Sequence, residues 1–183
     1  MPSVSAGAHT RTAQAGAPPF HISLSDVEKR AFRSALGAFA TGVTVITTLD
    51  MHGKPTGLTV NSFASVSMDP PLVLWSQIKS APSHPHFQNA DTMVINVLSH
   101  EQNHLAMQFA QPSPDKFAGV ACGATECGVP ILEGCSAYFV CRKVAQYYGG
   151  DHTIYLCGVE KFVNNNTPPL IFCQGSFRQK HDL

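Results

Sequence analysis

The pattern of apolar and polar positions predicts a chain built mainly of β-strands. Residues 43–48 are β-branched and alternate along the chain, and a turn at 52–55 separates them from a second apolar run, as in a hairpin. Further strands share long apolar or alternating runs and are expected at 71–77, 92–98, 136–147, 153–163 and 170–177. The first of these is apolar enough for burial on both faces. Many antiparallel strands without long parallel crossovers favour a closed or split barrel.

The N-terminal part of the chain divides into an arm and a helix. Residues 1–20 are rich in Ala, Gly, Ser, Thr and Pro, which predicts a flexible arm, so the folded domain is expected at 21–183. Ser25 and Glu28 have the spacing of a capping box. Apolar residues then recur at helical spacing, and we expect an amphipathic helix that ends near Gly42 and covers the core.

Two shorter helices are expected among the strands. Residues 83–89 form the first, between the strands at 71–77 and 92–98. Ser99 and Gln102 have the spacing of a second capping box. The helix that follows them is expected to end before the next proline, and its apolar residues lie on one face.

Composition and charge then limit the classes of partner. Charged residues make up 13% of the 183 residues, which predicts a surface partly buried against another protein. Twelve basic residues balance twelve acidic ones, so neither nucleic acid nor a membrane is an expected partner. The chain shows no apolar run long enough to span a bilayer and no signal-peptide pattern, and its six cysteines contain no Cys-x-x-Cys pair. We therefore expect a cytoplasmic protein with reduced thiols.

One motif points to metal chemistry. His100, Glu101 and His104 match the His-Glu-x-x-His pattern of zinc peptidases, in which two imidazoles one turn apart bind the metal. Polar residues lie between the histidines, and nothing upstream holds His100 rigid. We interpret the match as a coincidence and expect no metal site, with a zinc peptidase as the remote alternative.

Three other stretches could bind a polar ligand. Small hydroxyl and amide side chains crowd 57–67, where they could hydrogen-bond a heteroaromatic ring or simply belong to an edge strand. Lys79, Ser80 and Ser83 open the short helix and, with its first N–H groups, could bind a phosphate. His152 follows a Gly-Gly-Asp turn at the start of a strand, where a histidine is either a surface residue or part of a site.

Several motifs in order resemble one family, the short-chain flavin reductases, which are the reductase components of two-component flavin-dependent monooxygenases. The resemblance spans about residues 28–178. The motifs that carry it are 39–48, 61–72, 95–99 with Gln102 and Leu105, 115–119, 150–153, and 169–172 with Gly175.

The resemblance implies an FMN-binding split β-barrel, mainly β with flanking helices and six antiparallel strands, assembled as a homodimer with flavin sites near the interface. It implies that the flavin ring is held by Thr56, Gly57, Leu58, Thr59, Asn61 and Ser62. It places the ribityl chain and phosphate beside Ser76, Gln77, Ile78, Lys79, Ser80, Ser83, Gln108 and Phe109. It places the nicotinamide beside His152, Phe172, Gln174 and Gly175.

The expected activity is therefore that of an NAD(P)H:flavin oxidoreductase. Hydride would pass from NADH or NADPH to FMN or FAD, and the reduced flavin would leave for a flavin-dependent oxygenase partner. The cofactors carry this chemistry, and the protein orients them. We expect His152 to orient or balance charge on the nicotinamide nucleotide. The alternative is an FMN-binding electron-transfer or flavin-storage protein without reductase activity.

Overall fold

The computed structural model describes residues 22–178, so the arm expected at 1–20 lies outside the described residues. Three helices and twelve strands are formed within this range. The helices are α1 (Asp26–Gly37), α2 (His84–Asn89) and α3 (Asn103–Ala110). The strands are β1 (Thr41–Gly42), β2 (Thr44–Leu49), β3 (Pro55–Val60), β4 (Ala64–Met68), β5 (Pro71–Ile78), β6 (Thr92–Val97), β7 (Cys122–Ala124), β8 (Pro130–Leu132), β9 (Ala137–Gly149), β10 (His152–Asn164), β11 (Ile171–Cys173) and β12 (Ser176–Arg178).

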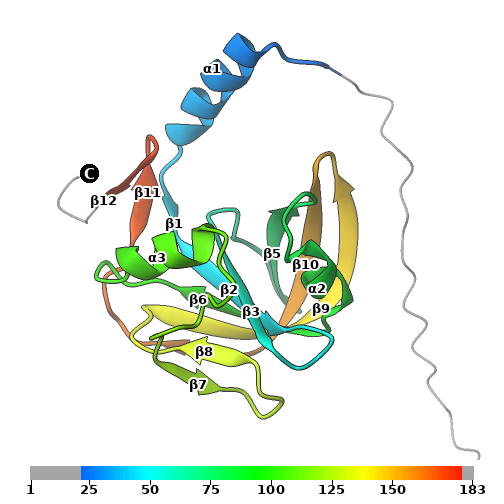
Figure 1. Ribbon diagram of the computed structural model, residues 1–183, viewed down its shortest axis with the longest axis vertical. Helices are drawn as coiled ribbons and strands as arrows, with labels where there is room; N and C mark the ends of the chain where they lie inside the picture. Colours follow the sequence, from blue (N-terminus) through cyan, green and yellow to red (C-terminus); the bar gives the residue numbers. More distant parts are fainter. Residues whose placement is uncertain (1–21, 179–183) are drawn as a thin grey trace, which may run out of the picture.

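The principal sheet contains seven strands in the order β3-β2-β6-β9-β10-β5-β4, and every neighbouring pair is antiparallel (Figure 1). The mainly β, antiparallel fold expected from the sequence is confirmed, and so is the β2–β3 hairpin. The sheet has one strand more than the six that the resemblance implied. Part of the polar stretch at 57–67 forms β4, an edge strand that bulges between Ser65 and Ser67.

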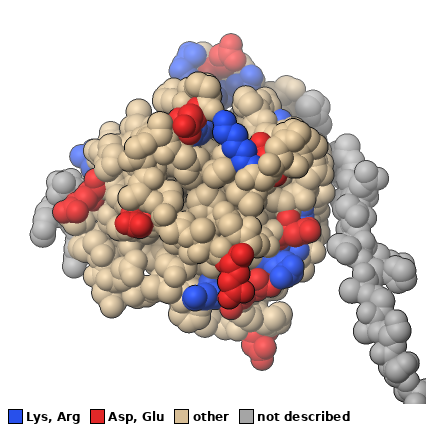
Figure 2. All heavy atoms as spheres, turned by 60° about the horizontal axis from the view of Figure 1, so that its bottom comes forward, with Lys and Arg blue, Asp and Glu red and all other residues tan. Residues whose placement is uncertain are grey.

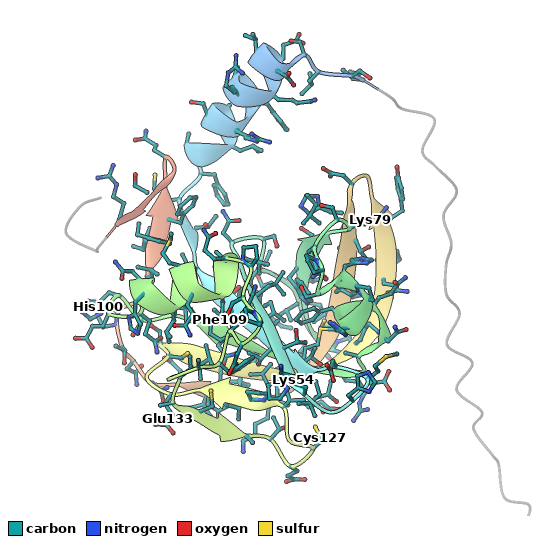
Figure 3. The ribbon with its side chains drawn as sticks, viewed as in Figure 1. Lys54, Lys79, His100, Phe109, Cys127 and Glu133 are labelled. Atoms are coloured by element: carbon teal, nitrogen blue, oxygen red, sulfur yellow. The ribbon has the colours of Figure 1, made fainter. Side chains whose placement is uncertain are left out.

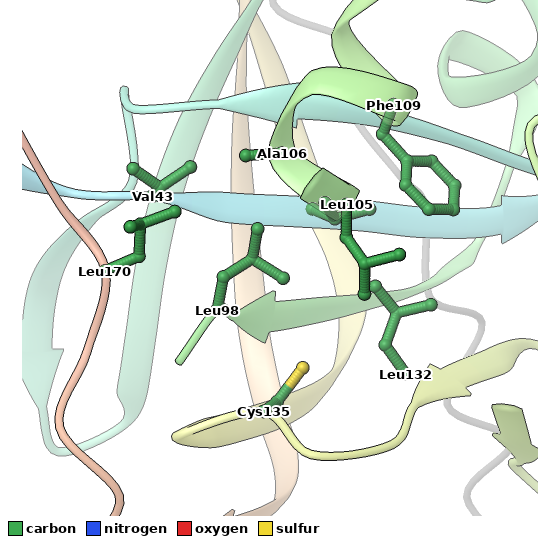
Figure 4. Packing of buried hydrophobic residues seen from close by; sticks show 9 residues of the cluster. Val43, Leu98, Leu105, Ala106, Phe109, Leu132, Cys135 and Leu170 are labelled. Carbon is green, nitrogen blue, oxygen red and sulfur yellow. The ribbon is translucent and has the colours of Figure 1, made fainter. Parts of the chain in front are cut away.

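Two apolar clusters fill the molecule. One lies beneath α3, where Leu105, Ala106 and Phe109 pack against Val43, Leu98, Leu132, Cys135 and Leu170 (Figure 4). The other lies between β5, β10 and α2. There Trp75 stacks on Tyr155 with ring centroids 4.5 Å apart and meets Phe87 edge-on at 5.2 Å. These contacts fix α2 and α3 on the sheet, and the two helices carry parts of the site described below.

The helix α1 departs from its expected role. Its capping box is confirmed, because the Glu28 N–H donates to Ser25 Oγ and the Ser25 N–H donates to Glu28 Oε2. The expectation that it covers the core is wrong, since no α1 residue is buried and the helix projects from the rest of the molecule (Figure 1). Its apolar residues Val27, Phe32 and Leu36 are 67%, 55% and 57% exposed.

Three local expectations also need correction. β5 is buried on alternate residues only, so one of its faces is partly exposed. The expected strand at 170–177 is instead the hairpin of β11 and β12, which turns at Gln174 and Gly175. The capping box expected at Ser99 and Gln102 is only half formed. The Gln102 side chain accepts the Ser99 N–H, but the Gln102 N–H donates to Ser99 O and not to the Ser99 side chain, and α3 begins after Gln102.

Charged side chains are sparse on the surface. In Figure 2 most of the face in view is uncharged, and Lys, Arg, Asp and Glu lie in small mixed groups. The one close ion pair on β9 and β10 joins Arg142 Nε to Glu160 Oε1 at 2.6 Å. No acidic or basic field therefore dominates this face.

Candidate functional site

A cavity of about 330 Å³ lies between β3, the segment leading into α2, and the connection from α3 to β7. Three of the residues expected to bind a cofactor line it, namely Thr56, Gly57 and Ser83. Two lysines that the sequence reasoning missed, Lys54 and Lys116, line it as well. The two lysines lie 62 positions apart in the chain, and only the fold brings them together.

The ammonium groups of both lysines are held by backbone carbonyls. Lys54 Nζ donates to Pro114 O at 3.3 Å, and Lys116 Nζ donates to Phe109 O at 2.7 Å. Partial burial lowers the pKa of Lys116 from its ordinary value. An ammonium carries three N–H donors, so each lysine can donate to a ligand in the cavity as well as to its carbonyl.

Two carboxylates share the cavity wall, and backbone N–H groups bind both. Asp50 Oδ1 accepts the N–H groups of His52 and Lys54, and the bond from Lys54 is the main reason its pKa lies below the ordinary value. Asp115 Oδ1 accepts the Phe117 N–H at 3.0 Å. These bonds offset part of the repulsion that the carboxylates would exert on an anionic ligand.

Several expected site residues hold the walls of this cavity in place. Gly57 lies so close to α3 that a Cβ there would stand 2.8 Å from Phe109 Cε1. Thr59 Oγ1 donates to Ala106 O at 2.7 Å, which fixes α3 on β3. Gln108 Nε2 donates to Lys116 O at 2.9 Å and to Ala118 O at 3.0 Å. The amide of Gln108 thereby holds the segment that carries Lys116.

The connection from β3 to β4 is joined to β5 by one hydroxyl. Ser62 Oγ donates to Ser76 O at 2.9 Å and accepts the Ser76 N–H at 3.0 Å. Ser62 thereby continues the β4–β5 register past Ala64 and Leu74, so these bonds hold the connection from β3 to β4 on β5. The neighbouring Asn61 is exposed, and Leu58 packs against the aromatic cluster.

Lys79 follows the last residue of β5 and lies beside the turn between β9 and β10 (Figure 3). Its Nζ donates to Gly150 O at 2.7 Å and sits 4.3 Å from the centroid of the Tyr148 ring. It is therefore engaged away from Ser83, although the sequence places the two side chains only four positions apart. Ile78 and Ser80, on either side of it, are exposed.

The short helix α2 offers no free N–H group at its start. His84 N donates to Ala81 O, Pro85 has no N–H, and His86 N donates to Ser83 O. The expectation that these groups bind a phosphate is therefore wrong. The Ser83 side chain makes no capping bond to the helix. It is instead bound by Gln77, whose Nε2 donates to Ser83 Oγ at 3.0 Å.

His152 begins β10 opposite Ile78 of β5, next to the turn that holds Lys79. Its Nδ1 lies 2.7 Å from Asp151 Oδ1, and this hydrogen bond is the main reason that the pKa of Asp151 lies below its ordinary value. The carboxylate orients the ring, because it favours a proton on Nδ1 and leaves Nε2 free for a ligand.

The last expected group lies on the other side of the molecule, beside the end of α1 (Figure 1). Phe172 is on β11 and meets Phe177 edge-on at 5.6 Å. Gln174 and Gly175 form a two-residue turn in which both have positive φ, and the Gln174 N–H donates to Gly37 O at 2.8 Å. The expected residues thus lie in separate groups, and Thr56, Gly57 and Ser83 are the ones that line the cavity.

The His-Glu-x-x-His motif lies at the start of α3. His104 is exposed, and His100 Nε2 lies 4.0 Å from Glu101 Oε1. Residues 22–178 contain no cluster of three potential metal ligands. Within the same range, no helix has the length and apolar character needed to cross a bilayer.

Comparisons with known proteins all indicate the same family. The sequence model described as "Flavin reductase like domain" matches residues 36–181. The chain is 46% identical over 148 residues to the FMN reductase (NADH) SmoA of Agrobacterium fabrum, covering 81% of this chain and 84% of that protein. It is 40% identical to the reductase component of the flavin-dependent trigonelline monooxygenase of Acinetobacter baylyi, but spans only 48% of its length.

A solved structure agrees. The NADH:FAD oxidoreductase SgcE6 of Streptomyces globisporus C-1027, in complex with NAD and FAD fragments, superposes with a TM-score of 0.79 at 37% identity. The match covers 86% of this chain and 96% of that one. The split-barrel fold implied by the sequence is thereby confirmed.

Proposed function

The chain belongs to the flavin reductase-like domain family, and on this premise we propose that it is an NAD(P)H:flavin oxidoreductase. It would pass a hydride from NADH or NADPH to FMN or FAD and supply the reduced flavin to a flavin-dependent monooxygenase component. The relatives named above support this proposal, since one is an FMN reductase that uses NADH and another is a monooxygenase reductase component.

The observation that carries the proposal is the chemistry of the cavity at β3. Lys54 and Lys116 bring two ammonium groups to a space of about 330 Å³, and Ser83 adds a hydroxyl. FMN ends in a phosphate and FAD carries a diphosphate, and at neutral pH both groups are anions that accept hydrogen bonds. Charge-assisted bonds from ammonium groups suit such an anion, so we assign the flavin phosphate to this cavity.

The remaining residues are proposed to bind and orient. When bound, the flavin and the nicotinamide supply the hydride chemistry themselves. Thr56 and Gly57, which line the cavity, and Ser62, which follows β3, are proposed to lie beside the flavin. His152, oriented by Asp151, presents Nε2 to the nicotinamide nucleotide. No side chain needs to act as acid, base or nucleophile in this scheme.

The decisive experiment follows the loss of nicotinamide absorbance with purified full-length protein. NADH and NADPH are each combined with FMN, FAD or no flavin. We expect oxidation of at least one nicotinamide that depends on added flavin, and the combinations identify the preferred pair. A protein that binds flavin tightly without oxidising either nicotinamide would instead support the storage or electron-transfer alternative.

We also propose that the protein is a homodimer in which α1 packs on the second copy. The helix is capped at its start by Ser25 and Glu28 but buries none of its own residues. Val27, Phe32 and Leu36 leave an apolar stripe on it, and the edge strand β4 adds exposed Val66 and Met68. Apolar surface of this extent on a stable helix is typical of an interface.

Sedimentation velocity tests the dimer. The protein is expected to sediment as a dimer at micromolar concentration, and Phe32→Asp with Leu36→Asp should shift it to a monomer because two charges would be buried. Arg33→Glu, on the polar side of the same helix, is the matched control and should leave the dimer intact. A monomeric wild-type protein would contradict the assignment.

The oxygenase partner and the cellular location complete the proposal. A reductase of this type needs an oxygenase that accepts its reduced flavin, and we propose such a partner for this chain. The six cysteines are all free within the described residues, which is typical of a reducing compartment and supports a cytoplasmic location.

A further inference from the structure

A short polar chain runs through the aromatic cluster and ends at the cavity. Gln77 on β5 is 1% exposed and Tyr155 on β10 is fully buried. Gln77 Nε2 donates to Ser83 Oγ at 3.0 Å, and the Tyr155 hydroxyl donates to Gln77 Oε1 at 3.5 Å. Ser83 itself lines the cavity. Tyr155 is therefore connected to the cavity through two side chains, although it does not line it.

The direction of these bonds follows from the burial of Tyr155. Burial raises the pKa of its phenol, so the hydroxyl keeps its proton. If the Gln77 amide were turned over, the phenol would accept from Nε2 and its own proton would lose the acceptor Oε1. A buried donor without an acceptor costs about 1–3 kcal/mol. The phenol thus favours the amide orientation in which Nε2 points to Ser83.

The orientation of Gln77 decides what Ser83 can do. A hydroxyl has one proton to donate and lone pairs to accept with. Because Gln77 donates to Ser83 Oγ, the serine proton is not used on Gln77. Among the described residues, Ser83 Oγ takes part in no other side-chain hydrogen bond, so its proton has no acceptor within the protein. It is therefore available to a ligand in the cavity, which Lys54 and Lys116 also line. In the opposite orientation, Gln77 would take this proton and leave only a lone pair facing the ligand.

We propose that Gln77 and Tyr155 are positioning residues that keep Ser83 a hydrogen-bond donor toward the flavin phosphate. Through Ser83 they give the protein a preference for flavins that carry a phosphate over riboflavin, which lacks it. This inference rests on the proposed function, because it needs a flavin nucleotide in the cavity. It adds the substrate feature that is recognised and the buried residues that set the recognition.

The test compares two substrates that differ by the phosphate. The KM values for FMN and riboflavin are measured at saturating nicotinamide for wild type, Ser83→Ala, Tyr155→Phe and the double variant. Ser83→Ala should raise the KM for FMN roughly tenfold, the effect of one charge-assisted hydrogen bond, and leave that for riboflavin within about twofold. Tyr155→Phe should raise the KM for FMN by roughly threefold, also without changing that for riboflavin.

The double variant separates positioning from general damage. If Tyr155 acts through Ser83, Tyr155→Phe has no further effect once Ser83 is alanine. Gln77→Glu, whose carboxylate can only accept from Ser83, should raise the KM for FMN at least as much as Ser83→Ala. Tyr138→Phe is the control for loss of a tyrosine hydroxyl elsewhere in the sheet and should change neither KM.

The proposal is overturned if Tyr155→Phe raises the KM for both flavins equally, changes neither KM, or keeps its effect on the KM for FMN in the Ser83→Ala background. A failure of the proposed function looks different, since the wild-type protein then oxidises no nicotinamide with any flavin. In that case the dissociation constants of FMN and riboflavin, measured by quenching of flavin fluorescence, give the same comparison. Equal changes in the two constants would again refute the positioning role.

Discussion

The contact between Gly57 and Phe109 allows a sharp test of how β3 and α3 fit together. A Cβ at position 57 would lie 2.8 Å from Phe109 Cε1 and 2.9 Å from Cδ1, about 0.6 Å inside the 3.4 Å at which ordinary contact begins. Phe109 is fully buried and meets Phe117 edge-on at 5.0 Å, so its ring is confined by its neighbours. Gly57→Ala should therefore overpack this site.

Overpacking of this kind lowers the free energy of unfolding by about 1–3 kcal/mol. The measurement is equilibrium denaturation by urea without flavin, so that ligand binding does not contribute. Gly123→Ala is the matched control, because a Cβ there meets nothing within 4 Å. The free energy of unfolding of this control should be unchanged or up to about 1 kcal/mol higher, since alanine restricts the unfolded chain.

A double-mutant cycle identifies the cause. Leucine at position 109 lacks the ring edge that the new methyl group meets. Gly57→Ala should therefore cost less in a Phe109→Leu background, with a coupling of at least about 0.5 kcal/mol. If Gly57→Ala leaves the unfolding free energy within about 0.5 kcal/mol of wild type, or if the two substitutions are additive, the contact does not limit this position.

Three further outcomes are expected. Ser62→Ala removes both hydrogen bonds to Ser76, so it should lower the free energy of unfolding by about 1–2 kcal/mol in the same denaturation assay. An unchanged value would mean that other contacts hold the β3–β4 connection on β5. The thiolate is the reactive form of cysteine, and the hydrogen bond from Thr125 lowers the pKa of exposed Cys127. Iodoacetamide should therefore label Cys127 before the buried thiols, and the midpoint of the pH dependence of this labelling should rise in Thr125→Val. Mass spectrometry of the labelled peptides identifies the first thiol to react, and a buried thiol reacting first would contradict the prediction. His152→Ala should raise the KM for the nicotinamide nucleotide, and unchanged KM and kcat with free flavin would remove its proposed role.

The sequence contained enough information for most elements of the fold. The strand at 43–48, found as β2, and the capping box at Ser25 depend on neighbouring residues, and both predictions are confirmed, although β2 is buried on both faces. β4 was not separated from the loop around it, because small polar residues suit an edge strand and a loop equally. The alternating burial of β5 was hidden, since its partly exposed face is apolar as well.

The site was harder to predict than the fold, for a physical reason. Lys54 and Lys116 come from separate connections, and their proximity depends on how α3 packs on β3. Lys116 lies in the 115–119 motif that carried part of the family resemblance, which was the one signal that could have identified it. The four-residue spacing of Lys79 and Ser83 also suggested a shared site that the structure does not form. The Lys79 side chain binds the β9–β10 turn, whereas Ser83 lines the cavity.

The projecting helix α1 has a consequence for how the stability of this protein should be measured. If its apolar stripe is covered only by a second copy, folding and association share one equilibrium, and mass action makes the melting temperature depend on protein concentration. Dilution would then unfold or inactivate the protein at a temperature where a concentrated sample stays intact. A single melting temperature would describe one concentration and not the chain.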